Sequence, residues 1–310
     1  MGYDLKLTVS QRHNNKARYQ RRNKMIYAIC HTLHNQVIRI EPEQFVFSGG
    51  EVQVTWPVGP LRGSQRIQVV ANLDSSDAIM ALMLGADAIR RATFSQPVIE
   101  LFIPYFPYAR QDRVCVEGQA LSVAVIAQMI NSLQCNRVTI CDPHSDVTSA
   151  MINNLTVKSQ ADIATRIKKF RRKLCHSDTV IVAPDAGASK KAITVSQACE
   201  RGTPVIQALK TRNQKTGDIN STEVLGDVSG KKCMIVDDIC DGGRTFIQLA
   251  DELIKRGATE VNLFVTHGIF SHGLGAFKGR ISNIYTTDSY PHECSSIDGV
   301  SLHVQPLKLL

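Results

Sequence analysis

Two adjacent carboxylates and a glycine-rich turn stand in the run VDDICDGGRT at 236–245. Apolar residues precede the acids, and the residues after Thr245 carry apolar side chains at helical spacing. The run therefore predicts a buried strand that ends in Asp237 and Asp238, a turn, and a helix N-terminus. Main-chain N–H groups there lie at the positive end of the helix dipole and suit a phosphate monoester. The paired acids suit a ribose diol or a magnesium ion. The alternative is an ordinary strand, turn and helix with a solvated acidic turn.

A second polar run, PYFPYARQDR at 104–113, follows an apolar stretch. Its arginines, its glutamine and the aromatic residues before them suit a nucleotide, with guanidinium on phosphate and ring on base. A structural loop held by an Arg–Asp pair fits these residues about equally well.

The run FSGGE at 47–51 is a weaker nucleotide candidate. Phe47 offers a ring to stack on a purine, and Glu51 offers a carboxylate to an exocyclic amine. Taken alone, this composition favours the corner of a β-hairpin.

Two further motifs, DPHSD at 142–146 and PDAG at 184–187, each follow a strand-like run. His144, flanked by carboxylates, suits a divalent ion, although a histidine at a strand end is more often structural. Asp185 with a small-residue turn suits a magnesium and ribose contact. We expect Lys190 and Lys191, which follow, to decorate the first helical turn.

Two cations, Lys210 and Arg212, open a long polar stretch that continues to residue 222. On a mobile loop they would close over a transferring phosphate and stabilise its charge. A solvated, flexible loop without such a role fits equally well.

The composition is that of a soluble globular protein, with 43% hydrophobic and 21% charged residues in 310. That length allows two domains of about 150 residues each. No apolar run approaches the roughly 18 residues of a membrane helix, and no secretory signal is visible. The nine cysteines are scattered without a C-x-x-C pair, which argues against a disulfide framework or zinc site and favours a reducing cytoplasm.

The net charge of +8 is concentrated near the N-terminus. Residues 11–24 hold six basic residues and no acid, which leaves a charge of two for the rest of the chain. This segment has one aromatic residue and no folding motif, so we expect a solvated extension rather than a nucleic-acid contact. The first apolar stretch begins at Met25, where we expect the folded part to start.

Short strand-like runs alternate with helix-length amphipathic segments, a pattern that predicts parallel sheets covered on both faces. The alternation restarts after residue 160, which predicts two lobes of similar size joined near 150–165. Every motif above falls at the carboxyl end of a predicted strand, where open α/β sheets bind ligands. The predicted strands are 67–70, 98–103, 138–141, 180–183, 205–208, 234–236 and 261–265, and the predicted helices are 77–91, 121–133, 161–174, 190–200 and 245–256.

With THGIFS at 266–271 these motifs make seven that stand in one order between about residues 25 and 287. In that order the chain resembles the ribose-phosphate diphosphokinases, the phosphoribosyl diphosphate (PRPP) synthetases. The resemblance implies an α/β fold of two phosphoribosyltransferase-like lobes, each a mainly parallel sheet flanked by helices. The expected parts are a basic extension at 1–24, a nucleotide-binding lobe at 25–160 and a ribose-phosphate-binding lobe at 161–310, whose last segment packs back on the first lobe.

The resemblance also implies a reaction and its residues. ATP and ribose 5-phosphate meet between the lobes, the anomeric hydroxyl attacks the β-phosphorus with Mg²⁺ as cofactor, and PRPP and AMP form. It further implies a homo-oligomer, a dimer or hexamer built from dimers. The expected ATP contacts are Phe47, Glu51, Arg110, Gln111 and Asp112; the magnesium ligands are His144 and Asp185; the acceptor contacts are Asp237, Asp238, Asp241, Gly242, Gly243, Arg244 and Thr245; and the transition-state cations are Lys210 and Arg212.

The chain departs from the family's pattern at three places. Gly49 stands where an acid is usual, 213–218 lacks the usual proline-containing run, and Arg244 stands where a small uncharged residue is usual. An arginine beside the 5-phosphate suits a more negative acceptor, so ADP-ribose is an alternative acceptor, as in NAD-rebuilding routes.

Two other classes use the same residues. A phosphoribosyltransferase would consume PRPP on the loop at 237–245, but that class leaves FSGGE and PYARQDR unexplained. A non-catalytic regulatory subunit is expected to lose the cations or metal ligands, which are present here.

Overall fold

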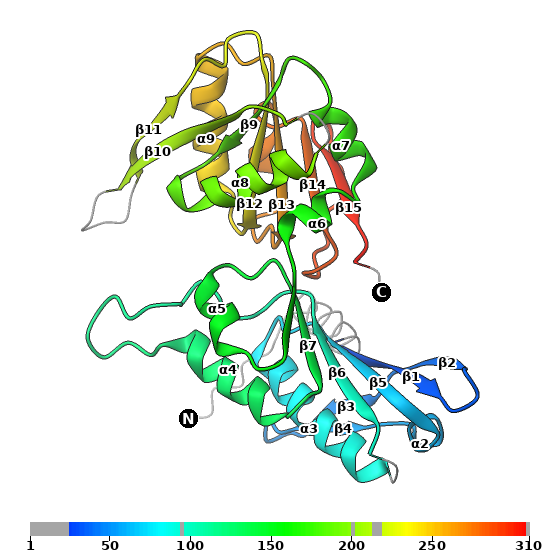
Figure 1. Ribbon diagram of the computed structural model, residues 1–310. Helices are drawn as coiled ribbons and strands as arrows, with labels where there is room; N and C mark the ends of the chain where they lie inside the picture. The colour runs from blue at the N-terminus through cyan, green and yellow to red at the C-terminus, as the bar shows by residue number, and fades with distance from the viewer. Residues whose placement is uncertain (1–24, 94–95, 200–201, 213–218, 308–310) are drawn as a thin grey trace, which may run out of the picture. The chain divides into compact units, whose positions relative to one another are not determined.

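The computed structural model describes residues 25–93, 96–199, 202–212 and 219–307 (Figure 1). The predicted extension at 1–24 lies outside these ranges. The chain divides into two compact units, the first through Thr156 and the second from Val157. Each unit has its own hydrophobic core.

The first unit is built on a six-stranded sheet in the order β2-β1-β5-β6-β7-β8. β5, β6 and β7 run parallel, whereas β1 is antiparallel to both β2 and β5. The parallel strands end at one edge, where the motifs at 104–113 and 142–146 follow β6 and β7. The strands are β1 (Ile26–Thr32), β2 (Val37–Ile40), β5 (Ser64–Ala71), β6 (Val98–Ile103), β7 (Arg137–Cys141) and β8 (Leu155–Lys158), and the helices are α2 (Val58–Arg62), α3 (Ser76–Ala92), α4 (Ser122–Ser132) and α5 (Asp146–Met151).

A separate hairpin, β3 (Glu43–Val46) and β4 (Val52–Thr55), is fastened to α3. The indole N–H of Trp56 donates to the main-chain oxygen of Gly85 in α3 at 2.9 Å. Gly85 is required for this approach, because a Cβ there would lie 3.0 Å from Cδ1 of Ile26 and 3.3 Å from the indole nitrogen.

The second unit holds a seven-stranded sheet in the order β11-β10-β9-β12-β13-β14-β15. All neighbouring strands are parallel except β10 and β11, which form an antiparallel pair. The strands are β9 (Thr179–Ala183), β10 (Val205–Arg212), β11 (Ile219–Leu225), β12 (Lys232–Cys240), β13 (Glu260–Gly268), β14 (Asn283–Thr287) and β15 (Ser301–Gln305), and the helices are α6 (Gln160–Ala164), α7 (Lys168–Leu174), α8 (Ala186–Ala198), α9 (Arg244–Lys255) and the 3₁₀ turn η1 (Gly275–Phe277).

Helices cover both faces of this sheet, as Figure 1 shows for α8 and α9. Alternate side chains of the buried strands point to opposite faces. Cys233 and Ile235 of β12 pack in one core with α9, while Met234 and Val236 pack in the other with α6, α7 and α8. The predicted α/β class with mainly parallel sheets is confirmed.

The order of strands reverses between β9 and β12. The chain runs from β9 outward to β10 and β11 and then returns to β12 on the other side of β9. In open α/β sheets such a switch point leaves a crevice at the carboxyl ends of the two strands. Asp185 follows β9 there, and Asp237 and Asp238 lie in β12.

Several predicted boundaries are wrong. The expected helix 161–174 is two helices: α6 ends at Ala164 and α7 begins at Lys168, and the Thr165 hydroxyl after α6 donates to the Asp162 main-chain oxygen. The helix expected at 190–200 begins at Ala186, directly after its cap. β12 runs on through both acids to Cys240, so they lie inside the strand rather than after it.

Within the described ranges, no helix has the length and apolar character needed to cross a membrane.

Candidate active site

Four neighbouring parallel strands of the second unit end at one edge of the sheet. They are β10, β9, β12 and β13, and each carries a motif at or beyond its carboxyl end. Ile235 of β12 pairs with Val182 of β9, so three residues further along each strand Asp238 comes level with Asp185. The sheet register therefore brings together acids that lie far apart in the sequence.

Asp238 is buried and paired. Its side chain is 7% exposed, and its Oδ2 lies 3.0 Å from Nζ of Lys191 in α8. Strand alternation places Asp238 on the sheet face of Met234 and Val236, which is the face that α8 covers. A buried carboxylate needs such a partner, because removing the charged group from water without a compensating cation costs several kcal/mol.

Asp237 is held through both its side chain and its main chain. The N–H of Asp238 donates to Oδ1 of Asp237 at 2.9 Å. The amide of Gln160 in α6 donates to the main-chain oxygen of Asp237 at 2.6 Å and approaches the Thr266 hydroxyl at 3.3 Å. Burial raises the pKa of Asp237 well above its ordinary value, and the charges of Asp238 and Asp185 raise this pKa further. The pair therefore resists carrying two negative charges when no hydrogen-bond donor or cation is bound.

Asp185 is the N-cap of α8. Its Oδ1 accepts from the N–H of Ala188 at 3.0 Å, while the Ser189 hydroxyl donates to its main-chain oxygen at 3.2 Å. The cap fixes this carboxylate at the start of the helix.

The glycine-rich turn after β12 is held from behind. Gly243 has φ 78° and is the N-cap of α9. A Cβ at Gly243 would lie 2.4 Å from Cζ of Phe277, so the buried ring packs directly against the turn. The N–H groups of Ile269 and Phe270 both donate to the main-chain oxygen of Cys240, at 2.8 and 3.1 Å. The turn and the segment after β13 thus form one packed body.

Arg244 and His272 flank this turn. Arg244 is the first residue of α9 and is exposed, and the first turn of the helix contains no acidic residue. A Cβ on Gly242 would lie 3.0 Å from Cδ2 and 3.3 Å from Nε2 of His272, so that imidazole lies against the turn. The main-chain N–H groups at the start of α9 lie at the positive end of the helix dipole, a position suited to an anion.

In the first unit the loops after β6 and β7 lie together. Asp112 is buried, and its Oδ1 accepts from Nε of Arg113 at 2.9 Å. That hydrogen bond lowers the pKa of Asp112, and the Ser145 hydroxyl and the charge of His144 lower it further. Arg110 and Gln111, next to this acid, have exposed side chains.

Phe47 and Glu51 lie at the corner of the β3–β4 hairpin. The N–H of Phe47 donates to the main-chain oxygen of Glu51 at 2.8 Å, and both side chains are exposed. The rings of Phe45 and Phe47 meet edge to face with centroids 4.7 Å apart. The hairpin corner is therefore observed, and it presents an aromatic ring to solvent.

Lys210 and Arg212 lie in β10, not in the mobile loop that we expected. Lys210 pairs with Thr222 of β11 and Arg212 with Ile219, because antiparallel pairing extends β10 at the sheet edge. The remainder of the expected loop, 213–218, lies outside the described residues.

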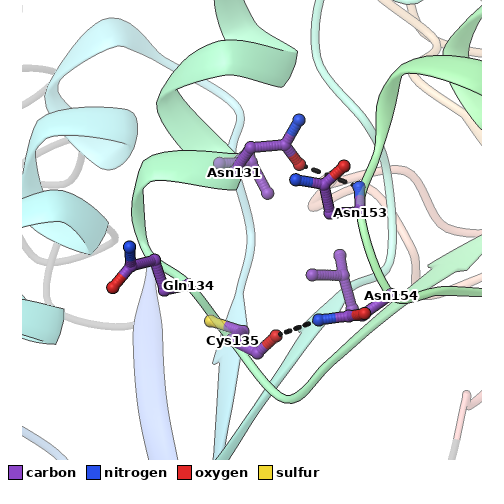
Figure 2. Close-up of a pocket in the computed structure, with 7 residues that line it drawn as sticks. Asn131, Gln134, Cys135, Asn153 and Asn154 are labelled. Atoms are coloured by element: carbon purple, nitrogen blue, oxygen red, sulfur yellow. Dashed lines mark hydrogen bonds between the residues drawn. The ribbon is translucent and has the colours of Figure 1, made fainter.

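A cavity of about 200 Å³ lies at the opposite end of β7 from His144. Figure 2 shows its polar lining: the N–H of Asn153 donates to the side-chain oxygen of Asn131 at 2.9 Å, and the amide of Asn154 donates to the main-chain oxygen of Cys135 at 3.0 Å. These amides fasten a turn to α4 and β7, so we assign the cavity no ligand.

The roles of three residues of this edge were missed in the sequence. Lys191, which we expected to decorate the first helical turn, lies in the second turn of α8 and pairs with Asp238. Lys191 stands three residues after the buried Ala188 and four before the buried Val195, a spacing that places it on the inner face of α8. Gln160 and His272 contact the site from segments far away in the sequence, and no local pattern marks them.

Comparisons with known proteins cover both units. Residues 18–133 match the domain family described as "N-terminal domain of ribose phosphate pyrophosphokinase", and residues 153–298 match the family described as "Phosphoribosyl transferase domain". A phosphoribosylpyrophosphate synthetase from Mycobacterium smegmatis has a similar structure, with a TM-score of 0.72 and 22% identity over 85% of each chain. The fold is therefore that of a two-domain phosphoribosylpyrophosphate synthetase.

Curated relatives share more of the sequence. The ribose-phosphate pyrophosphokinase of Agrobacterium fabrum is 32% identical over 69% of this chain and 68% of its own. That of Ureaplasma parvum is 31% identical over 83% of this chain and 77% of its own. The chain belongs to the ribose-phosphate pyrophosphokinase family, and the resemblance seen in its motifs is confirmed. It is thus a transferase-type enzyme by family, while the oligomer and the cytoplasmic location stay predictions.

The packing behind the turn gives a direct test. Replacing Gly243 by Ala places a side chain in a left-handed conformation and against Phe277, and we expect it to lower the free energy of unfolding by roughly 2–5 kcal/mol. Gly275→Ala is the control, because its Cβ would meet nothing within 4 Å. Urea denaturation measures both, and equal stability of the two variants would contradict the packing.

Proposed function

We propose that the chain transfers the diphosphoryl group of ATP to the anomeric hydroxyl of ribose 5-phosphate. The bond from the anomeric oxygen to the β-phosphorus forms, and the bond from that phosphorus to the α,β-bridging oxygen breaks. AMP leaves with the bridging oxygen, and the hydroxyl proton passes to solvent. The observation that carries the proposal is the acid pair followed by the anion-binding turn at the switch point, in a chain with a pyrophosphokinase N-terminal domain.

The second unit supplies the acceptor side of this proposal. Asp237 and Asp238 accept hydrogen bonds from the two ribose hydroxyls, which also relieves the repulsion between the acids. The residues Asp241 to Thr245 hold the 5-phosphate at the start of α9. These residues hold the sugar by its 5-phosphate and its two hydroxyls. The anomeric hydroxyl therefore stays unbound by them and is positioned to react.

The first unit supplies the ATP side. Arg110, Gln111 and Asp112 follow β6, and the low pKa of Asp112 keeps that carboxylate ionised at neutral pH. Phe47 and Glu51 offer a ring and a carboxylate suited to adenine. We propose that these residues bind the nucleotide whose diphosphoryl group is transferred.

Magnesium fits the donor groups that are present. Mg²⁺ usually keeps several waters and binds one or two carboxylates together with substrate phosphates. Within the described residues, no group of three or more histidine, cysteine or acidic side chains gathers to hold a metal alone. Asp185 offers the oxygen that such a phosphate-bridged ion needs, and we propose His144 as a magnesium ligand of the first unit. When bound, the ion neutralises charge on the transferring phosphates.

The direct test is product identification. We expect the full chain with ATP, Mg²⁺ and ribose 5-phosphate to form PRPP and AMP in equal amounts. Mass spectrometry identifies and quantifies both products. EDTA should stop the reaction, and excess Mg²⁺ should restore it. PRPP consumption without AMP formation from ATP would favour a phosphoribosyltransferase, and absence of both would favour a regulatory subunit.

The cations of β10 give the second test. Phosphoryl-type transfer gains chiefly from positioning and charge neutralisation, so Lys210→Ala should lower kcat by about 100-fold or more. Lys255→Ala is the control, since that lysine is exposed at the end of α9. Circular dichroism checks that both variants are folded, and a loss of less than tenfold in kcat contradicts the assignment.

A second acceptor is suggested by the arginine at the start of α9. Arg244 is exposed at the first position of that helix, and a guanidinium is suited to a phosphate beyond the 5-phosphate. ADP-ribose carries a second phosphate beyond the 5-phosphate and keeps a free anomeric hydroxyl. We propose ADP-ribose as the alternative acceptor on this ground.

Competing acceptors distinguish the two. With ADP-ribose as acceptor, Arg244→Ala should lower kcat/KM at least tenfold, while Arg244→Lys retains the charge and should lose less. With ribose 5-phosphate the same changes should have a smaller effect, because the second phosphate is absent. If the wild-type chain forms no diphosphorylated product from ADP-ribose, this alternative fails.

A further inference from the structure

We propose that Lys191 is a positioning residue for the acceptor, because its salt bridge holds the Asp238 carboxylate in place. The inference rests on the proposed function and extends it to a helix that none of the predicted contacts includes. Lys191 acts through Asp238, so it need not touch the substrate itself.

Asp238 is more deeply buried than its partner Lys191. The Asp238 side chain is 7% exposed and that of Lys191 is 25% exposed, with 3.0 Å between Nζ and Oδ2. Asp238 therefore has little access to water, whereas the lysine reaches it along the inner face of α8, beside Ala188 and Ala192. The contact fixes one carboxylate oxygen and with it the plane of the group that would receive a ribose hydroxyl.

The Lys191–Asp238 salt bridge offsets part of the negative charge that three acids place at the switch point. Burial and the negative charges of Asp238 and Asp185 raise the pKa of Asp237, whereas the positive charge of Lys191 lowers it. Without the lysine, the buried Asp238 carboxylate would lose its cationic partner and turn away from its neighbour. That movement displaces the hydrogen-bond acceptor that the sugar requires.

Helix α8 links the two sides of the crevice. Asp185 caps its first turn through the N–H of Ala188, and Lys191 pairs with Asp238 from the second turn. Because both contacts belong to one short helix, the acid beyond β9 and the acid in β12 keep a fixed spacing. A displaced α8 would lose both at once.

The test compares Lys191→Met with Lys191→Arg and with Lys190→Met. The control removes the same charge from the adjacent, exposed position of the same helix. We expect Lys191→Met to raise the Kd for PRPP and the KM for ribose 5-phosphate at least tenfold, with the KM for ATP changed less than twofold. Lys191→Arg should restore both values to within about threefold of wild type, and Lys190→Met should leave them unchanged.

A double-mutant cycle then separates positioning from folding. If Lys191 acts through Asp238, adding Lys191→Met to Asp238→Asn should change the Kd for PRPP far less than Lys191→Met does alone. Thermal unfolding checks each variant, and Lys191→Gln replaces the methionine variant if that one does not fold.

The outcomes distinguish this inference from the proposed function. Calorimetry measures PRPP binding without turnover. An inactive wild-type chain that binds PRPP would therefore defeat the proposed reaction, while the Kd values of the Lys191 variants would still test the inference. An unchanged Kd in Lys191→Met, an equal rise in both KM values, or additive effects in the cycle would overturn the inference. Failure of the wild-type chain to bind either ribose 5-phosphate or PRPP would overturn both.

Discussion

Two carboxylates side by side in a buried strand repel each other, and the second unit is arranged around that repulsion. Asp238 is neutralised by Lys191 from α8, and Asp237 is held through the amide of Gln160 and the N–H of its neighbour. These partners come from two helices on one face of the sheet and from the strand itself. The position of α6 and α8 is therefore tied to the chemistry of β12 as well as to the packing of apolar side chains.

Much of the fold follows from the sequence, because the period of its apolar residues differs between strands and helices. The run at 98–103 is β6 with unchanged bounds, and the helix expected at 77–91 is α3 to within one residue at each end. The break between α6 and α7 was not predictable from apolar spacing, because buried Ala164 at the end of α6 and buried Ile167 just before α7 continue the apolar pattern. β15 was not predicted, and at the edge of the sheet its side chains are half-exposed or exposed, without the buried apolar run that marks the inner strands.

The candidate site could be proposed from the sequence only at positions where residue type alone suggests the chemistry. Acids, glycines and cations at strand ends mark Asp185, Asp238 and the turn before α9, and parallel pairing brings them to one edge. Partners that act by position were not visible: Gln160 is 77 residues from Asp237, and His272 meets Gly242 through the packing of a later loop. Their side chains have no chemistry that distinguishes them from other glutamines and histidines until the chain is folded.

The ring of Phe277 behind Gly243 has a consequence for affinity. Binding a ligand to a loose loop costs conformational entropy for every residue that becomes ordered. Here the main-chain oxygen of Cys240 and the ring of Phe277 already hold the turn in shape before any ligand arrives. The ordering is completed when the protein folds, so the attraction between the turn and an anion is available for binding almost undiminished: the turn is preorganised.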